Sequence, residues 1–130
     1  MKEQISQVRF PEVEPLKLAA ARDSIPIRDT QKTDWFVLSL DGEVVACAGV
    51  YWMSKAARLK AMWTTPEWRG QGLGIKLAEA CIAHVEEKRP GTAVEIYSRR
   101  PETFERLGFE IVPGRKSPGG SVMLRKHGRK

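Results

Sequence analysis

Hydrophobic and polar residues follow two different periods along the chain, and these periods predict most of its elements. Apolar runs of strand length cover 35–40, 43–52 and 58–64, and Asp41-Gly42 separates the first two. An Asp-Gly pair between two such runs is the strongest short hairpin signal, because its tight turn needs positive φ at both residues. With a further turn before the third run, the pattern predicts an antiparallel meander of three strands.

Helical spacing replaces the strand pattern after the meander. From Gly74 to Lys88 apolar residues recur three and four positions apart, which predicts one amphipathic helix packed on the sheet. A strand is predicted over 93–98, followed by a helix from Pro101 to Leu107, because proline is favoured in the first turn of a helix. Gly108 then suits the left-handed residue that often ends a helix.

The N-terminal part has a weaker pattern. Residues 5–10 alternate weakly and stop at Pro11, which is typical of a short edge strand. Residues 12–22 have helical spacing, with Pro15 tolerable in the first turn, and 23–34 show little periodicity. This part therefore predicts a strand, a helix and a loop.

The C-terminal part predicts a last strand pair, 109–113 with 121–125. The prolines and glycines of 114–120 indicate a mobile loop between these strands, and 126–130 are expected to form a frayed basic end. The chain has no internal repeat, no low-complexity segment and no linker. We therefore expect one α+β domain over residues 1–130.

Three alternating glycines stand between the third strand and the long helix. Gly70, Gly72 and Gly74 occur in the stretch Thr-Thr-Pro-Glu-Trp-Arg-Gly-Gln-Gly-Leu-Gly-Ile-Lys-Leu. Alternate glycines let the backbone take positive φ and approach a ligand closely, and the first N–H groups of a helix have no intrahelical partner. The stretch therefore predicts an anion-binding cradle, and phosphate is its natural ligand.

Two common phosphate-binding motifs do not fit this cradle. A P-loop requires Gly-Lys-Ser/Thr, but Ile75 follows Gly74. The dinucleotide motif needs a third small residue, and that position holds Ile75 or Leu77, depending on the register. Glu95 lies about where that motif has its ribose-binding carboxylate, roughly 20 residues on. The spacing to Glu95 therefore fits the dinucleotide motif, and it is the missing third glycine that excludes this motif.

The pattern Arg69-x-x-Gly72-x-Gly74 resembles the acetyl-coenzyme A motif Arg/Gln-x-x-Gly-x-Gly/Ala of the GNAT superfamily of N-acetyltransferases. Downstream, Phe-Glu-Arg-Leu-Gly-Phe at 104–109 resembles the second signature of the family, which usually ends as Tyr-x-x-x-Gly-Phe. The resemblance implies a GNAT-like fold with a mixed, mostly antiparallel central sheet flanked by helices. The family usually has a second helix where 23–34 is predicted to be a loop, which implies an open acceptor side.

The resemblance also implies where acetyl-coenzyme A binds. The pyrophosphate would lie on the backbone of the cradle, and the pantetheine arm would pair with the strand before it like an added strand. Trp63 is expected close enough to the acetyl group to shape the acceptor pocket. The predicted cofactor-binding residues are Met62, Trp63, Thr64, Arg69, Gly70, Gln71, Gly72, Leu73, Gly74 and Phe104.

Acetyl transfer needs a hydrogen-bond donor for the developing oxyanion and an acceptable leaving thiolate. The resemblance implies that a backbone N–H of the strand donates a hydrogen bond to the oxyanion. Many relatives protonate the thiolate with a tyrosine of the second signature, but Phe104 stands at that position. Tyr97 is the predicted replacement acid, with packing or a surface position as the alternative. Ser98 is a further candidate, with helix capping as its alternative.

No carboxylate stands out as the base that deprotonates the amine. Lys60 stands where some relatives carry an acid, and Glu95 is either a base or a solvated strand residue. His84 lies beside the apolar helical stripe and is interpreted as structural. Cys47 and Cys81 form no disulfide framework or metal site, and we interpret both as buried core residues.

Composition and charge narrow the class of protein further. The 130 residues are 42% hydrophobic, which is enough for a core. No apolar run approaches the roughly 20 residues of a membrane span, and the first residues do not resemble a signal sequence. We therefore expect a soluble cytoplasmic protein with no membrane partner. The net charge of +6 attracts anions, among them coenzyme A and nucleic acids.

Two functions therefore remain. The first is an acetyl-coenzyme A-dependent N-acetyltransferase in which a primary amine attacks directly in a ternary complex. The second is a weak or inactive GNAT-fold module that binds coenzyme A or an anionic partner such as nucleic acid. Phe104 and the missing base favour the second function, and the intact cradle favours the first. The sequence leaves open the acceptor and the oligomeric state, a homodimer included.

Overall fold

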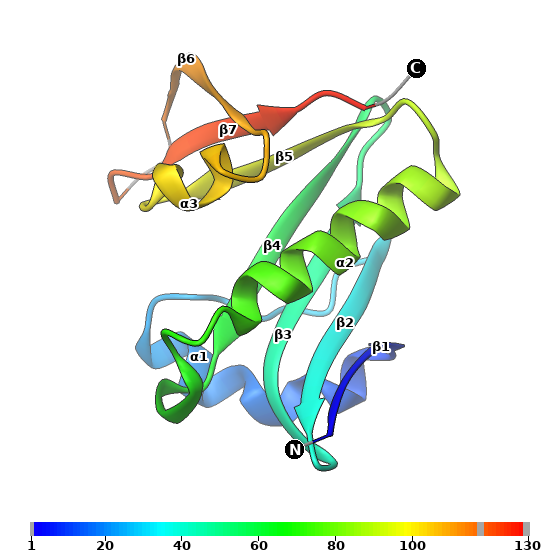
Figure 1. Ribbon diagram of the computed structural model, residues 1–130, viewed down its shortest axis with the longest axis vertical. Helices are drawn as coiled ribbons and strands as arrows, with labels where there is room; N and C mark the ends of the chain where they lie inside the picture. The colour runs from blue at the N-terminus through cyan, green and yellow to red at the C-terminus, as the bar shows by residue number, and fades with distance from the viewer. Residues whose placement is uncertain (1, 117–118, 129–130) are drawn as a thin grey trace.

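The computed structural model describes residues 2–116 and 119–128. Within these ranges one seven-stranded sheet forms the centre of the molecule, with the strand order β1-β2-β3-β4-β5-β7-β6 (Figure 1). The β4–β5 pair is parallel and the other pairs are antiparallel, so the predicted mixed sheet and the α+β class are confirmed. The strands are β1 (Glu3–Val8), β2 (Thr33–Leu40), β3 (Glu43–Trp52), β4 (Ala56–Thr64), β5 (Ala93–Ser98), β6 (Glu110–Lys116) and β7 (Val122–Lys126).

Helices cover both faces of the sheet. The long helix α2 lies across β2, β3 and β4 on one face, and α1 lies behind the same strands on the other (Figure 1). No helix among the described residues is both long and apolar enough to cross a membrane. The α-helices are α1 (Lys17–Arg22), α2 (Leu73–Lys88) and α3 (Pro101–Glu105), and the 3-10 turns are η1 (Phe10–Glu12), η2 (Glu14–Leu16) and η3 (Pro66–Trp68).

The predicted hairpin forms with the predicted turn. Leu40 pairs with Glu43, which leaves Asp41 and Gly42 as the two turn residues. Their φ angles are 49° and 85°, as a two-residue turn of this twist requires. The antiparallel meander from β2 to β4 is therefore confirmed.

Two cores lie on opposite faces of the sheet. The larger core packs the apolar stripe of α2, including Leu77 and Cys81, against the central strands. The smaller core joins Val13 and Ala20 to Trp35, Cys47 and Trp63 of the strands, among others. Burial raises the pKa of Cys47 and of Cys81 to about 12, so both thiols stay neutral, and their interpretation as core residues is confirmed.

The N-terminal helix is shorter than predicted. Residues 10–16 form the turns η1 and η2, and regular α-helix starts only at Lys17. Proline has no N–H and its ring opposes a preceding helical turn, so Pro11 and Pro15 divide the segment into tight turns. The predicted edge strand is confirmed, because β1 pairs with β2 at the outer side of the sheet.

The C-terminal elements also differ in extent from the prediction. Gly108 has φ 93° and ends the helical segment in the left-handed conformation, as expected. However, β6 continues to Lys116, into the predicted loop, and Lys126 is the last residue of β7 and not part of a frayed end. Lys126 Nζ donates to the Leu107 carbonyl at 2.8 Å, which holds this end of β7. Residues 117–118 of the predicted loop and 129–130 of the predicted basic end lie outside the described residues.

Candidate active site

The glycine cradle has the backbone conformation that an anion-binding loop needs. Gly70 and Gly72 have φ angles of 80° and 78°, and a Cβ built on either residue would meet no atom within 4 Å. The first hydrogen bond of α2 runs from Lys76 N–H to the Gly72 carbonyl at 3.1 Å, so the N–H groups before it have no partner inside the helix. The space above these groups can take an anion, and the positive end of the helix dipole favours one.

Arg69 is exposed, yet its side chain anchors the start of the cradle. Its Nε donates to the Thr64 carbonyl at 2.9 Å, and a terminal nitrogen contacts Asp23 Oδ2 at 2.7 Å. Asp23 also accepts a hydrogen bond from Trp63 Nε1 at 2.8 Å. The hydrogen bond from Trp63 and the charged contact with Arg69 lower the pKa of Asp23 below its ordinary value. This network joins the end of α1, the end of β4 and the cradle.

β4 and β5 pair only at their beginnings. The parallel register runs from Ala56 opposite Ala93 to Arg58 opposite Glu95, and the strands diverge beyond that point (Figure 1). β4 continues to Thr64 with β3 on one side only, among the described residues. Its other edge presents unpaired backbone groups, which an extended ligand can use as a neighbouring strand would.

A β-bulge interrupts β4 where its edge is open. Cys47 pairs with Trp63 and Gly49 with Lys60, so Ala61 and Met62 together oppose a single residue of β3. Ala61 has φ 52°, which is uncommon for a residue with a side chain. The neutral Cys47 thiol donates to the Ala61 carbonyl at 3.4 Å and supports the bulge. A bulge of this kind redirects backbone groups, and such strained positions cluster at functional sites.

Tyr97 lies on β5 beyond the point of divergence. The Arg58 guanidinium carbon is 5.1 Å from the centre of its ring, which places Tyr97 on the same face as Arg58. Ser98, the next residue, accepts a hydrogen bond from Arg100 N–H at 2.9 Å, just before α3. The structure therefore engages Ser98 in the turn before α3, but Ser98 does not cap this helix, because Arg100 is the N-cap residue and no side chain caps it. Tyr97 lies beside the gap between β4 and β5.

Phe104 faces the larger core. Its ring packs edge-to-face on Phe109 with centroids 5.7 Å apart, and it contacts the residues buried under α2 and α3. A phenylalanine at this position has no proton to donate. Trp63 is likewise buried, in the smaller core, with 5% of its surface exposed. The contacts of Phe104 and Trp63 with coenzyme A stay predictions.

Glu95 is a buried ion-pair residue, and the interpretation of Glu95 as a solvated strand residue was wrong. Arg125 contacts Glu95 Oε2 at 2.7 Å and Arg58 contacts Oε1 at 3.2 Å. Burial alone would raise the pKa of Glu95, but the hydrogen bonds and charges of Arg125 and Arg58 outweigh burial and lower it. A carboxylate with a lowered pKa is a poor proton acceptor near neutral pH.

His84 lies on the buried face of α2. One ring nitrogen lies 2.8 Å from Asp34 Oδ2. The ring packs edge-on against Phe36, with 4.8 Å between the two ring centroids. Asp34 also accepts a hydrogen bond from Trp52 Nε1 at 2.9 Å. These contacts support the interpretation of His84 as a structural residue.

A cavity of about 450 Å³ opens near the divergence of β4 and β5. Lys60 lines it and donates to the Thr30 hydroxyl. The Lys60 ammonium lies 5.4 Å from the ring centres of both Trp35 and Tyr51. Burial lowers the pKa of Lys60, and the nearby charge of Asp29 opposes this effect.

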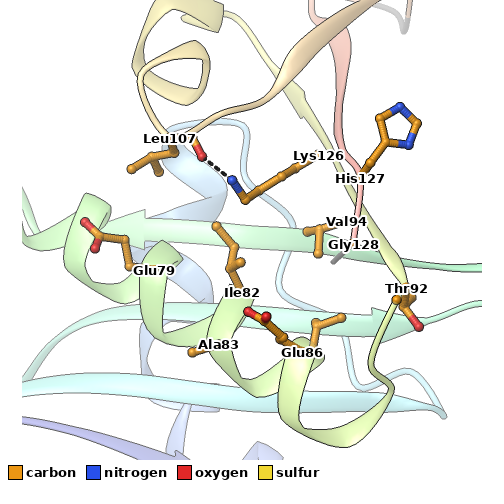
Figure 2. Close-up of a pocket in the computed structure, with 12 residues that line it drawn as sticks. Glu79, Ile82, Ala83, Glu86, Thr92, Val94, Leu107, Lys126, His127 and Gly128 are labelled. Carbon is orange, nitrogen blue, oxygen red and sulfur yellow. Dashed lines mark hydrogen bonds between the residues drawn. The ribbon is translucent and has the colours of Figure 1, made fainter. Parts of the chain in front are cut away.

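A second cavity, of about 290 Å³, lies at the opposite end of α2 from the cradle. Figure 2 shows it between the side chains of Ile82 and Glu86 on the helix and those of Val94 and Lys126 on the strands. None of the predicted site residues lines it. We therefore locate the candidate active site at the cradle and the open edge of β4.

The sequence matches a known protein family over more than half of the chain. A family model described as the acetyltransferase (GNAT) domain matches residues 31–111, which include β2 to β5, the cradle and α3. The chain therefore belongs to the GNAT acetyltransferase family. No curated protein sequence matches the chain.

Solved structures share the fold at low sequence identity. The ribosomal-protein-S18-alanine N-acetyltransferase from Escherichia coli has a TM-score of 0.82 and 17% identity, over 99% of this chain and 96% of that one. N-acetylglutamate synthase from Neisseria gonorrhoeae, complexed with coenzyme A and N-acetyl-glutamate, has a TM-score of 0.78 and 15% identity. That match covers 100% of this chain but 36% of the synthase. These likenesses establish the GNAT fold and do not identify an acceptor.

The sequence indicated the cradle but missed the residues that hold and surround it. The sequence predicts only a loop at Asp23, yet Asp23 fixes both Trp63 and Arg69. It predicts strands at Tyr51 and Arg58 without indicating that both line the cavity beside the gap. Polar residues interrupting a strand on one face gave a weak signal, but their partners lie 30 or more residues away along the chain.

Proposed function

We propose that the chain is an acetyl-coenzyme A-dependent N-acetyltransferase, in which a primary amine attacks directly in a ternary complex. The observation that carries this proposal is the direct succession of bulge, open strand edge and backbone cradle from Ala61 to Gly74. The membership of the family supports an acyl-transfer reaction. The coenzyme A bound to the synthase from Neisseria gonorrhoeae supports the same ligand for this chain.

The residues present fit coenzyme A. The backbone of Gly70, Gln71, Gly72, Leu73 and Gly74 would hold its pyrophosphate, because Gly70 and Gly72 leave the approach clear. Each favourable charge at this helix end contributes about 0.3–1 kcal/mol. The open edge of β4 at Met62, Trp63 and Thr64 would pair with the amides of the pantetheine arm. When bound, acetyl-coenzyme A supplies an acetyl group activated as a thioester.

The residues around the bulge would promote the transfer. A backbone N–H at the bulge of Ala61 and Met62 would donate a hydrogen bond to the oxyanion. Tyr97 is the proposed proton donor to the departing thiolate, because it lies beside the gap and carries a hydroxyl that Phe104 lacks. A thiol of ordinary pKa near 8.5 also leaves without protonation, at a rate cost of up to about 10²–10⁴.

A thiol-release assay with acetyl-coenzyme A and a panel of amines tests the reaction. We expect release that depends on the amine, together with saturable binding of coenzyme A in calorimetry. Coenzyme A binding without thiol release for any acceptor would favour the inactive module instead. Tight nucleic-acid binding in a gel-shift titration without affinity for coenzyme A would reject both the cofactor and the reaction.

The whole chain is proposed to act as a single acetyltransferase domain. The sheet runs without interruption from β1 to β6, and the family match ends at residue 111, inside β6. β7 inserts between β5 and β6, so the last described strand belongs to the same sheet as the cradle. Removal of residues 119–128 should therefore abolish coenzyme A binding together with folding, as measured by calorimetry and circular dichroism.

A further inference from the structure

The cavity beside the gap is surrounded by positive charge. It lies on the sheet face opposite α2, because Lys60, which lines it, reaches over Trp35 of the smaller core. Three of its six lining residues are cationic and none is acidic. They come from the loop before β2, from β3 and from β4, and they are Thr30, Gln31, Lys32, Tyr51, Arg58 and Lys60.

We propose that this cavity binds the carboxylate of the acetyl acceptor, so that the acceptor is a small amino carboxylate such as a free α-amino acid. The assignment rests on the proposed acetyltransferase function, which leaves the acceptor class open. The cavity is open to solvent, and its volume of about 450 Å³ leaves room for a small molecule. A cationic lining repels diamines and polyamines, which carry no compensating negative charge.

Lys60 presents an ammonium in a defined position. The rings of Trp35 and Tyr51 lie on its sides, each with a centroid 5.4 Å from Nζ, and the Thr30 hydroxyl accepts one of its hydrogen bonds. An ammonium has three donors, so two remain for a ligand. Because the lysine is partly buried, a carboxylate in the cavity would restore the solvation that the charge has lost.

Arg58 supplies a second cation at the cavity wall. One terminal nitrogen contacts Glu95, but Arg125 contacts the same carboxylate more closely. Two arginines share one carboxylate, so one positive charge of this group is left over. The carboxylate of Asp29 also acts on the cavity, because its charge raises the pKa of Lys60.

The backbone around the cavity is held in a specific form. Lys32 has φ 62°, and its carbonyl accepts a hydrogen bond from Trp52 N–H at 2.8 Å, which fixes the loop against β3. A non-glycine residue at such an angle is strained and persists where surrounding contacts enforce it. The backbone that carries Lys32 is therefore anchored at the cavity, while its side chain is exposed.

The position of the cavity suits an acceptor next to the reacting atoms. Arg58 is the last β4 residue paired with β5, and Lys60 directly precedes the bulge at Ala61. A carboxylate held by these two cations would lie a short distance from the bulge along the strand. In an α-amino acid the amine is separated from the carboxylate by one carbon, so its amine would face the gap where the acetyl group is expected.

Matched acceptors test the inference. Free amino acids and their α-amides are compared in the thiol-release assay, with cadaverine as a diamine. We expect kcat/KM to be at least about 10-fold higher for the acid of a pair, which is the size expected for a charge-assisted hydrogen bond. Lys60→Gln should lower kcat/KM for the acids to about that of their amides and so remove this preference. Lys88→Gln, which changes an exposed lysine on the opposite face, is the matched control and should keep the preference.

Binding without turnover separates this inference from the proposed function. Calorimetry of the protein saturated with coenzyme A compares N-acetylglycine with N-acetylglycinamide. Carboxylate-selective binding that Lys60→Gln abolishes, without acetyl transfer to any amine, would support the cavity assignment and reject the proposed function. Acetylation of amides or cadaverine as fast as of amino acids would overturn the cavity assignment and leave the function standing. Absence of binding for both compounds would also overturn it.

Discussion

The cradle and the cationic cavity recognise their ligands by different means. The cradle uses backbone N–H groups of one continuous stretch, Gly70 to Gly74, whose side chains contribute little. The cavity uses side chains that three separate segments bring together, with Lys60 at its centre. A backbone site depends on residues that allow a conformation, whereas a side-chain site depends on which strands become neighbours. The cradle should therefore be disrupted by adding a side chain, and the cavity by removing one.

The largest effect is expected at the cradle. Gly72→Val should abolish coenzyme A binding, because a side chain at φ 78° is strained and enters the space through which a phosphate approaches. Gly114→Val is the matched control, since Gly114 has φ 75° and equally open surroundings in β6. Calorimetry should show loss of affinity only for the first variant. Full affinity in a folded Gly72→Val protein would contradict the cradle assignment.

The next effect concerns stability beside the cavity. Glu95→Gln should lower the free energy of unfolding by about 3 kcal/mol, because it leaves the positive charges of Arg58 and Arg125 uncompensated in a partly buried site. Glu87→Gln, an exposed position on α2, should change it by less than about 0.5 kcal/mol. Urea denaturation measures both. An equal, small effect of the two changes would show that the ion pairs at Glu95 contribute no net stability.

The lowered pKa of Glu95 also predicts how this contribution depends on pH. The folded-state pKa is below the ordinary value of 4.5, so the unfolded chain binds the proton more readily. The stabilisation is therefore complete above that value and is lost as the pH falls through the lower folded-state pKa. Unfolding experiments between neutral and acidic pH should show a smaller pH dependence for Glu95→Gln than for the wild type.

The proton donor separates chemistry from binding. Tyr97→Phe should lower kcat by about 10²-fold without changing the affinity for coenzyme A, because the ring and its contact with Arg58 are retained. Phe104→Tyr is the companion variant and should leave kcat unchanged, because the ring at this position packs against Phe109. Steady-state kinetics and calorimetry give the two readouts. An unchanged kcat in both variants would mean that the thiolate leaves without a proton from either side chain.

The smallest effect is expected where the cradle is anchored. Asp23→Asn should weaken coenzyme A binding by about 10-fold or less, because Arg69 loses the charged partner that orients it. Asp29→Asn removes a carboxylate near Lys60 instead and should leave this affinity unchanged. Calorimetry of both variants compares the two sites directly. A larger loss for Asp29→Asn would show that the cavity and the cradle are coupled.

The elements that could be predicted are those with a local cause. Asp41-Gly42 determines a tight turn because few other pairs accept its φ angles, and the strand over 93–98 has the predicted bounds. The helix predicted over 12–22 is too long, because the prediction followed the helical spacing of apolar residues and underestimated the effect of Pro15. Glu95 was misjudged because its two arginine partners lie 37 and 30 residues away.

The sequence by itself determined the cradle, since glycine is the residue that takes positive φ without strain and leaves room for a ligand, and glycine is visible in any sequence. It also determined the order of the elements, through their periods of hydrophobic residues. Only the tertiary structure decided that β4 and β5 separate after Arg58, that Ala61 forms a bulge, and that Lys32, Arg58 and Lys60 surround one cavity. These features arise from pairing between distant segments, and no local pattern encodes which residues a neighbouring strand will bring alongside.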